Sequence, residues 1–155
     1  MRRKPSAKRV LSADPKYNNS IVSKLVNYVM WDGKKSIARE VIYDAFDIIS
    51  KDTKKDPMDV FDEAIKNAAP MLEVKSRRIG GANYQVPRQV KGDRRITLAL
   101  KWMVEAARAK KGQPMATKLA SEIMAAAQNT GEAVKRKENT HRMAQANRAF
   151  AHFSW

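Results

Sequence analysis

The chain has 155 residues, a length that suits one domain with a continuous core. Its 31 Lys and Arg residues against 16 Asp and Glu residues give a formal charge of +15, which indicates a polyanionic partner. The lack of cysteine excludes disulfides and thiolate chemistry, and no apolar run is long enough for a membrane span or a secretory signal, so we expect a soluble, intracellular protein.

The charge is unevenly distributed along the chain. Residues 40–73 hold nine of the sixteen acids and only four lysines, a local charge of −5, so the remaining residues carry +20. This asymmetry predicts one face that meets an anion and another that is turned away from it.

The first segment, residues 1–19, is basic and has few apolar residues to pack. Its cations include Arg2, Arg3, Lys8 and Arg9. We expect an extended tail that binds an anion, and the alternative is a disordered end that only aids solubility.

Helical periodicity then predicts three helices before residue 70. The first begins at Ser20, the second at Ser36, and the third at Asp56 and Pro57, which supply a capping side chain and a proline at the first helical position. The loop between the first two helices reads DGKK, and we interpret Lys34 and Lys35 as candidate phosphate contacts.

Residues 71–91 predict a β-hairpin arm. Two extended segments, 71–79 and 84–90, flank Gly80-Gly81-Ala82-Asn83, which we interpret as a longer loop. Pro87 is compatible with a ribbon because both strands are edges. Seven cations lie between residues 73 and 95, so we expect an exposed arm that is loosely held until an anion lies against it.

Three helices are expected after the arm. Asp93 is predicted to cap the fourth, in which Arg94, Lys101 and Arg108 share one face at seven-residue spacing and Trp102 is expected in the core. The fifth helix follows residues 112–114. The last segment, 132–155, is a basic helix so polar that it needs a partner to lie on.

No catalytic or metal-binding constellation stands out, and no cofactor is expected. His141 and His152 are the only histidines, and we expect surface or RNA-facing roles for both. Gly33 to Ser36 lack the upstream glycine of a phosphate-binding loop. The eight methionines are interpreted as core filler, and Tyr84 as a candidate for stacking on a base.

Nucleic acid is therefore the expected partner. The cations are spread over a tail, a loop, an arm and two helices, which suits a folded RNA better than a uniform duplex. An architectural DNA-binding protein that uses a basic β-arm is the alternative.

Three segments carry a family resemblance: MLEVKSRRIGGANYQVPRQV in the arm, DGKK after the first helix, and GEAVKRKENTHRMAQANRAFAHFSW at the end. Together they closely resemble the seventh small-subunit ribosomal protein of the bacterial and organellar type. The resemblance implies a mainly α single domain, residues 1–155, with about six helices, one protruding two-stranded hairpin and a basic tail. It also implies a location in the cytoplasmic ribosome, or in an organellar one if the source is organellar.

The resemblance further implies direct binding to small-subunit ribosomal RNA, nucleation of head assembly and no enzymatic activity. The implied RNA-binding residues are Arg2, Arg3, Lys8, Arg9, Lys34, Lys35, Lys75, Arg77, Arg78, Arg94 and Arg95. The helix that follows the arm continues this positive surface through Lys101 and Arg108. We expect contacts to phosphates, which position the protein more than they specify sequence.

Further partners are implied at the arm tip and the C-terminus. Residues expected near exit-site transfer RNA and the messenger exit path are Gly80, Gly81, Asn83, Tyr84, Lys135, Arg136, Lys137 and Arg142. Phe150, Phe153 and Trp155 are expected to touch the eleventh small-subunit protein. Ser154 stands where the family commonly has arginine, which affects one terminal contact. Some members repress their own messenger, and the sequence leaves this open here.

Overall fold

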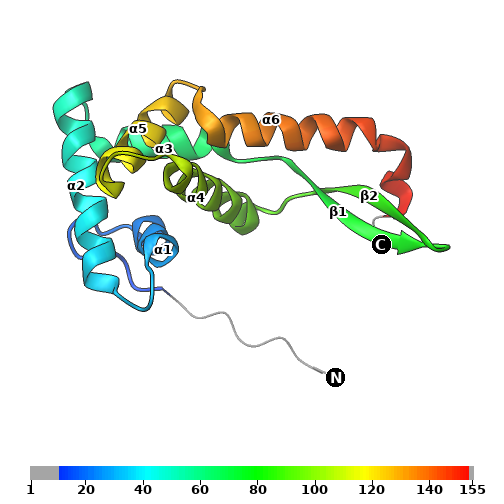
Figure 1. The fold of residues 1–155 in the computed structure, drawn as a ribbon, viewed down its shortest axis with the longest axis horizontal. Coiled ribbons are helices and arrows are strands. Elements are labelled where there is room, and N and C mark those ends of the chain that lie inside the picture. The colour runs from blue at the N-terminus through cyan, green and yellow to red at the C-terminus, as the bar shows by residue number, and fades with distance from the viewer. Residues whose placement is uncertain (1–10, 154–155) are drawn as a thin grey trace.

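A computed structural model describes residues 11–153. Its elements, in chain order, are α1 (Ser20–Val29), α2 (Lys35–Thr53), α3 (Pro57–Ala68), β1 (Leu72–Ile79), β2 (Ala82–Gln89), α4 (Gly92–Ala109), α5 (Met115–Ala127), α6 (Gly131–Ala146) and the 3-10 helix η1 (Arg148–Phe153). The expected mainly α fold with a single hairpin is confirmed. The molecule is elongated, with α2 at one end and the hairpin tip at the other (Figure 1).

The core is built around α5, which contacts α2, α3, α4 and α6. Leu119 and Ile123 of α5 are fully buried, as are Phe46 of α2, Phe61 of α3 and Leu100 of α4. These side chains recur at helical spacing, so each helix presents one apolar stripe to the others. Trp102 packs against this core and is partly buried, in agreement with the sequence.

Local capping chemistry starts α1 and α3, and of the two predicted caps, Asp56 is confirmed. The Asn19 side chain accepts a hydrogen bond from the Ile21 N–H at 2.7 Å, and Asp56 accepts from the Met58 N–H at 2.9 Å. The prediction that Asp93 caps α4 is wrong. Helical hydrogen bonding begins earlier, because the N–H groups of Arg94 and Arg95 both donate to the Lys91 carbonyl. Asp93 lies in the first turn, where its charge complements the helix dipole.

The hairpin pairs Leu72 with Gln89 at its base and Ile79 with Ala82 at its tip. The connection is therefore a two-residue turn, and the expected longer loop is wrong. Gly80 and Gly81 have φ values of +57° and +93°, and glycine adopts such angles without a steric penalty. Two consecutive positive φ angles are the geometry that matches the twist of a tight hairpin.

The chain before α1 is anchored earlier than expected. The Asp14 carboxylate, 2% exposed, accepts hydrogen bonds from the Tyr43 hydroxyl and from the N–H groups of Lys16 and Tyr17. The Tyr17 ring packs on Phe46 at 5.1 Å between centroids. The predicted tail therefore does not extend to residue 19. The tail residues Arg2, Arg3, Lys8 and Arg9, and the terminal Ser154 and Trp155, lie outside the described residues.

The arm does not stand alone. Helix α6 contacts both strands, and η1 lies against β2, so the C-terminal segment runs along the hairpin (Figure 1). Helix α6 also contacts α4 and α5, which confirms that this polar helix has a partner to lie on. Within residues 11–153, no helix is long and apolar enough to cross a membrane.

Candidate nucleic-acid interface

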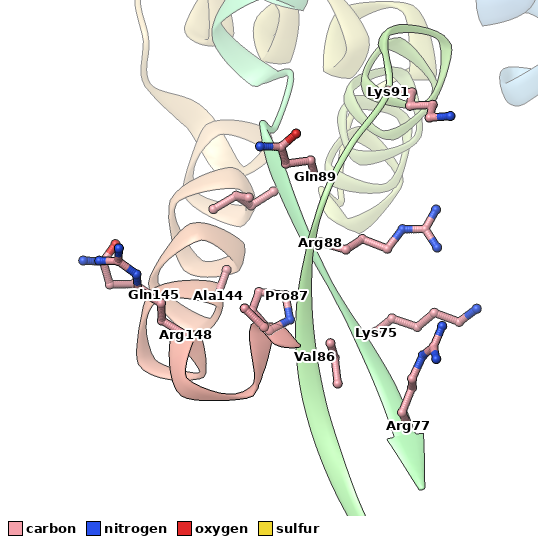
Figure 2. A pocket seen from close by; sticks show the side chains of 12 residues that line it. Lys75, Arg77, Val86, Pro87, Arg88, Gln89, Lys91, Ala144, Gln145 and Arg148 are labelled. Carbon is pink, nitrogen blue, oxygen red and sulfur yellow. The ribbon is translucent and has the colours of Figure 1, made fainter. Parts of the chain in front are cut away.

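The arm presents cations without acidic partners. Lys75, Arg78 and Lys91 are exposed, and within the described chain none of them forms an ion pair. Lys75, Arg77, Arg88 and Lys91 extend from one side of the hairpin, away from α6 (Figure 2). Side chains of paired residues share a face of a two-stranded ribbon, which brings Lys75 and Arg77 onto the face that also holds Arg88.

The only acid on the strands, Glu73, neutralises part of this charge. Its carboxylate lies 3.4 Å from Arg88 Nε and 3.3 Å from Arg94 Nε, and 18% of its side chain is exposed. The Arg95 Nε is buried and has no hydrogen-bond partner among residues 11–153. The start of α4 therefore offers less free charge than its sequence indicates.

An open groove of about 820 Å³ lies along the arm. Its polar lining comes from Lys75, Arg77, Arg88, Gln89, Lys91, Gln145 and Arg148. Its apolar lining comes from Leu72, Val86, Pro87, Ala144 and Ala151 (Figure 2). Cations around an apolar floor can contact phosphates and cover the less polar sugar and base surfaces of a nucleotide.

The predicted basic stripe of α4 exists, but each member has an intramolecular partner. Arg94 pairs with Glu73, and Lys101 lies 3.8 Å from Glu105. Arg108 donates to the carbonyls of Tyr28 and Val29 at the end of α1, at 3.1 and 3.3 Å. These contacts leave the charges at the surface, where solvent-exposed pairs are worth about 0–1 kcal/mol and can exchange for phosphate.

Most cations of the basic cluster on α6 also have intramolecular partners. Lys135 pairs with Glu132 at 2.8 Å, and this hydrogen bond raises the pKa of the Lys135 ammonium. Arg136 pairs with Glu105, and the Lys137 Nζ donates to the Asn67 carbonyl at 2.6 Å. Arg142 is the one predicted cation of this helix that has no partner among the described residues.

His141 has a structural role that the sequence did not indicate. Its Nε2 accepts a hydrogen bond at 3.0 Å from the N–H of Met71, directly before β1. Burial, helped by the nearby Lys137 charge, lowers the pKa of the His141 imidazole. His141 nevertheless remains partly exposed and His152 is exposed, so the expected surface or RNA-facing role of both stays a prediction. No local sequence signal could have found this contact, because its partner is 70 residues away.

Three aromatic residues contact one another, although the sequence predicted RNA as the partner of Tyr84 and another ribosomal protein as the partner of Phe150 and Phe153. The ring of Tyr84 lies 4.9 Å from that of Phe150 and 6.1 Å from that of Phe153, between centroids. We call these three residues the aromatic cluster. All three remain partly exposed, and Gly80, Gly81 and Asn83 at the tip are exposed.

The DGKK loop presents two further cations. Asp32 and Gly33 have φ values of +50° and +74°, and the Lys34 N–H donates to the Trp31 carbonyl at 3.0 Å. Asp-Gly suits this tight turn because both residues tolerate a positive φ. Lys34 and Lys35 are exposed and form no ion pair with any described residue.

The acids gather on other elements. Helices α2 and α3 carry the exposed carboxylates Asp44, Asp47, Asp59, Asp62 and Glu63. Helix α2 lies at the end of the molecule opposite the arm tip (Figure 1), so the predicted charge asymmetry has a structural counterpart. In the part of the chain that the structure covers, no group of His, Asp or Glu residues is arranged to hold a metal ion.

Sequence comparison identifies the family of this basic protein. The family described as "Ribosomal protein S7p/S5e" matches residues 1–148. The chain is 60% identical over 155 residues to the small ribosomal subunit protein uS7 of Thermotoga maritima, with both chains fully covered. It is 57% identical over 148 residues to uS7 of Moorella thermoacetica, which covers 96% of this chain and 95% of that protein. The chain therefore belongs to the ribosomal protein S7p/S5e family, whose members are structural proteins of the small ribosomal subunit and not enzymes.

Proposed function

We propose that this protein binds small-subunit ribosomal RNA directly and nucleates assembly of the subunit head. The observation that carries the proposal is that Lys75, Arg78 and Lys91 are exposed and have no acidic partner among residues 11–153. Lys75 and Lys91 extend from the same side of the hairpin as Arg77 and Arg88 (Figure 2). Phosphate is the ligand that a row of such side chains favours, because each contact releases condensed counterions from the RNA.

The shape of the molecule supports binding to a folded RNA. The arm, the DGKK loop and the outer face of α4 carry cations on separate elements, so they can meet phosphates that point in different directions. The exposed acidic residues of α2 and α3 disfavour contact of RNA with their own faces and so help to orient the encounter. A rigid body that holds several RNA segments in one geometry can initiate assembly of a larger particle.

The arm tip and α6 support the finer part of the proposal, proximity to exit-site transfer RNA and the messenger path. Gly80, Gly81 and Asn83 are exposed and small enough to let an RNA backbone approach closely. Arg142 provides a charge on α6 that has no acidic partner among residues 11–153. Contact with the eleventh small-subunit protein would use the exposed parts of Phe150 and Phe153. Repression of its own messenger would need only an RNA that imitates the ribosomal site.

The proposal is tested by competition binding of the full chain at near-physiological salt. A head fragment of small-subunit ribosomal RNA competes with equal masses of unrelated structured RNA and duplex DNA. We expect a preference for the head fragment. Equal binding to all three nucleic acids would contradict the proposal, and a preference for duplex DNA would favour the architectural alternative.

A further inference from the structure

Trp31 is the most exposed of the large apolar side chains in the described structure, with 67% of its surface accessible. It follows Met30, the C-cap of α1, and begins the turn that leads into the DGKK loop. Single exposed aliphatic residues are ordinary at protein surfaces. An exposed tryptophan is less ordinary at a surface, because its indole ring is the largest apolar side-chain surface that a protein can offer.

One face of the Trp31 ring is supported by Arg108. The Arg108 guanidinium carbon lies 5.3 Å from the ring centroid, within the range of a cation–π contact. The same guanidinium is held by the carbonyls of Tyr28 and Val29 at the end of α1. Because Arg108 comes from α4, two helices fix the position of the cation and thereby order the indole. The exposure of the ring leaves its other face open to a ligand.

The surroundings of this ring are cationic. Lys34 and Lys35 follow within four residues, are exposed, and have no acidic partner among residues 11–153. A flat aromatic surface beside two free ammonium groups is the combination that binds single-stranded nucleic acid, in which the ring stacks on a base and the cations contact phosphates. Aliphatic side chains such as Ile37, 54% exposed, offer no such flat π face.

We infer that Trp31 stacks on an unpaired base of the RNA that this protein binds, while Lys34 and Lys35 hold the flanking phosphates. This inference rests on the proposed function and names one point of base contact within a surface otherwise made of phosphate contacts. Stacking tolerates any base, so the residue selects for an unstacked nucleotide rather than for a sequence.

Three substitutions of Trp31 test the inference with the full chain and the ribosomal head fragment. Trp31→Ala should weaken binding roughly 5- to 150-fold, the range observed for loss of one stacked base. Trp31→Phe should retain most of the affinity, whereas Trp31→Leu, which keeps an apolar side chain without a π face, should behave like Trp31→Ala. Thermal unfolding should be nearly unchanged in all three, because the side chain is exposed.

Salt dependence separates stacking from charge. Trp31→Ala should leave the slope of log affinity against log salt unchanged, whereas Lys34→Ala combined with Lys35→Ala should reduce its magnitude by about one to two. Saturating RNA should also quench tryptophan emission in the wild-type chain, and Trp31→Phe should remove most of that change.

Wild-type affinity in Trp31→Ala, or in Trp31→Leu alone, would overturn the inference while the proposed function stands. Trp31 emission unaffected by saturating RNA would also overturn it and would point to a protein partner for the ring. Loss of RNA preference by the wild-type chain itself would contradict the proposed function, and the inference with it.

Discussion

At the scale of single residues, Glu122 shows how the fold accommodates a buried charge. It is 1% exposed on α5, where the Lys110 Nζ lies 2.9 Å from one carboxylate oxygen and the Ala133 N–H donates to the other at 3.0 Å. Thr130 precedes α6 and makes no side-chain capping bond, so Glu122 satisfies a helix N–H from a neighbouring element. Its charge also complements the positive end of the α6 dipole.

Gly131 is required next to this carboxylate. Its φ is +88°, and an added Cβ would lie 3.0 Å from Glu122 Oε1 and 3.1 Å from the Ala125 Cβ. We therefore expect Gly131→Ala to lower the free energy of unfolding by about 1–3 kcal/mol, through backbone strain and the displaced carboxylate.

The matched control is Gly92→Ala, at the start of α4, where φ is not positive and nothing lies within 4 Å of the added Cβ. This substitution should be neutral or stabilise the protein by about 0.4–1 kcal/mol. Denaturant unfolding of both variants measures the contrast, and equal effects would show that Gly131 is not under steric constraint.

His141 predicts a pH dependence of stability. The folded protein holds the neutral imidazole, since burial lowers its pKa and Nε2 must stay unprotonated to accept from the Met71 N–H. The stabilisation should be complete above the ordinary histidine value of 6.5 and should be lost as the pH falls through the lower pKa of the folded state.

The measurement is denaturant unfolding of the wild type and His141→Gln between about pH 7.5 and about pH 5. Glutamine offers an acceptor that does not titrate, so this variant should lose less stability on acidification than the wild type. The exposed His152→Gln is the matched control and should keep the wild-type pH dependence. Parallel curves for wild type and His141→Gln would remove His141 as the cause.

At the scale of elements, the arm depends on the C-terminal segment. An isolated two-stranded hairpin is marginally stable in water, but here α6 contacts both strands, η1 contacts β2, and Val86 is only 2% exposed. Lys137 and His141, one turn apart on α6, also bind backbone groups of residues 67 and 71, which flank the junction of α3 with β1. Together these contacts set the direction in which the arm leaves the body.

The aromatic cluster gives a test of this support. Phe150→Ala removes the ring that packs on Tyr84 at 4.9 Å, and we expect a loss of about 1–2 kcal/mol because the side chain is only partly buried. Amide hydrogen exchange should become faster in the arm and η1 while α2 and α5 are unaffected, since the core does not use this ring.

Ala149→Ser, an exposed change in the same 3-10 helix, should leave the exchange pattern unchanged. Uniform acceleration in the core and the arm after Phe150→Ala would mean that the hairpin and the helical body unfold as one unit.

At the scale of the whole molecule, the separation of charge predicts which cations bind RNA. Lys75 and Arg78 lie on the arm and have no acidic partner in the described chain, whereas Lys54 and Lys55 lie between the acidic helices α2 and α3. Charge reversal of Lys75 and Arg78 should weaken RNA binding and lower the magnitude of the salt slope by about two. Reversal of Lys54 and Lys55 should have a much smaller effect, and equal effects would show that the interface lies elsewhere.

The affinity as a whole should depend strongly on salt. If the protein neutralises about six to ten phosphates, its affinity for RNA should fall about 10³- to 10⁵-fold between 50 and 200 mM salt. Binding titrations of the full chain across this range measure the slope. A flat response would contradict a mechanism based on phosphate contacts.

The fold was largely predictable because apolar periodicity is a local property. The start of α1 at Ser20 follows from periodicity, the start of α3 follows from Asp56 and Pro57, and the hairpin follows from two extended segments around paired glycines. The start of α4 and the length of the hairpin turn were not predicted correctly. A backbone hydrogen bond to the Lys91 carbonyl sets the first, and the positive φ angles of Gly80 and Gly81 set the second. Several local choices satisfy such a segment equally well, and packing selects one.

The positive charge of the candidate interface and its approximate location were predictable from the sequence, but the availability of each residue was not. The sequence alone determined the helical class, the basic arm and the excess of cations over acids, because these depend on composition and short-range periodicity. Only the tertiary structure decided which cations are available. It pairs Arg94 with Glu73 and Lys137 with the Asn67 carbonyl, and it buries Tyr84 partly under Phe150. The partners in these contacts are separated by between 21 and 70 positions in the sequence. Helix packing brings them together, and no local sequence pattern encodes it.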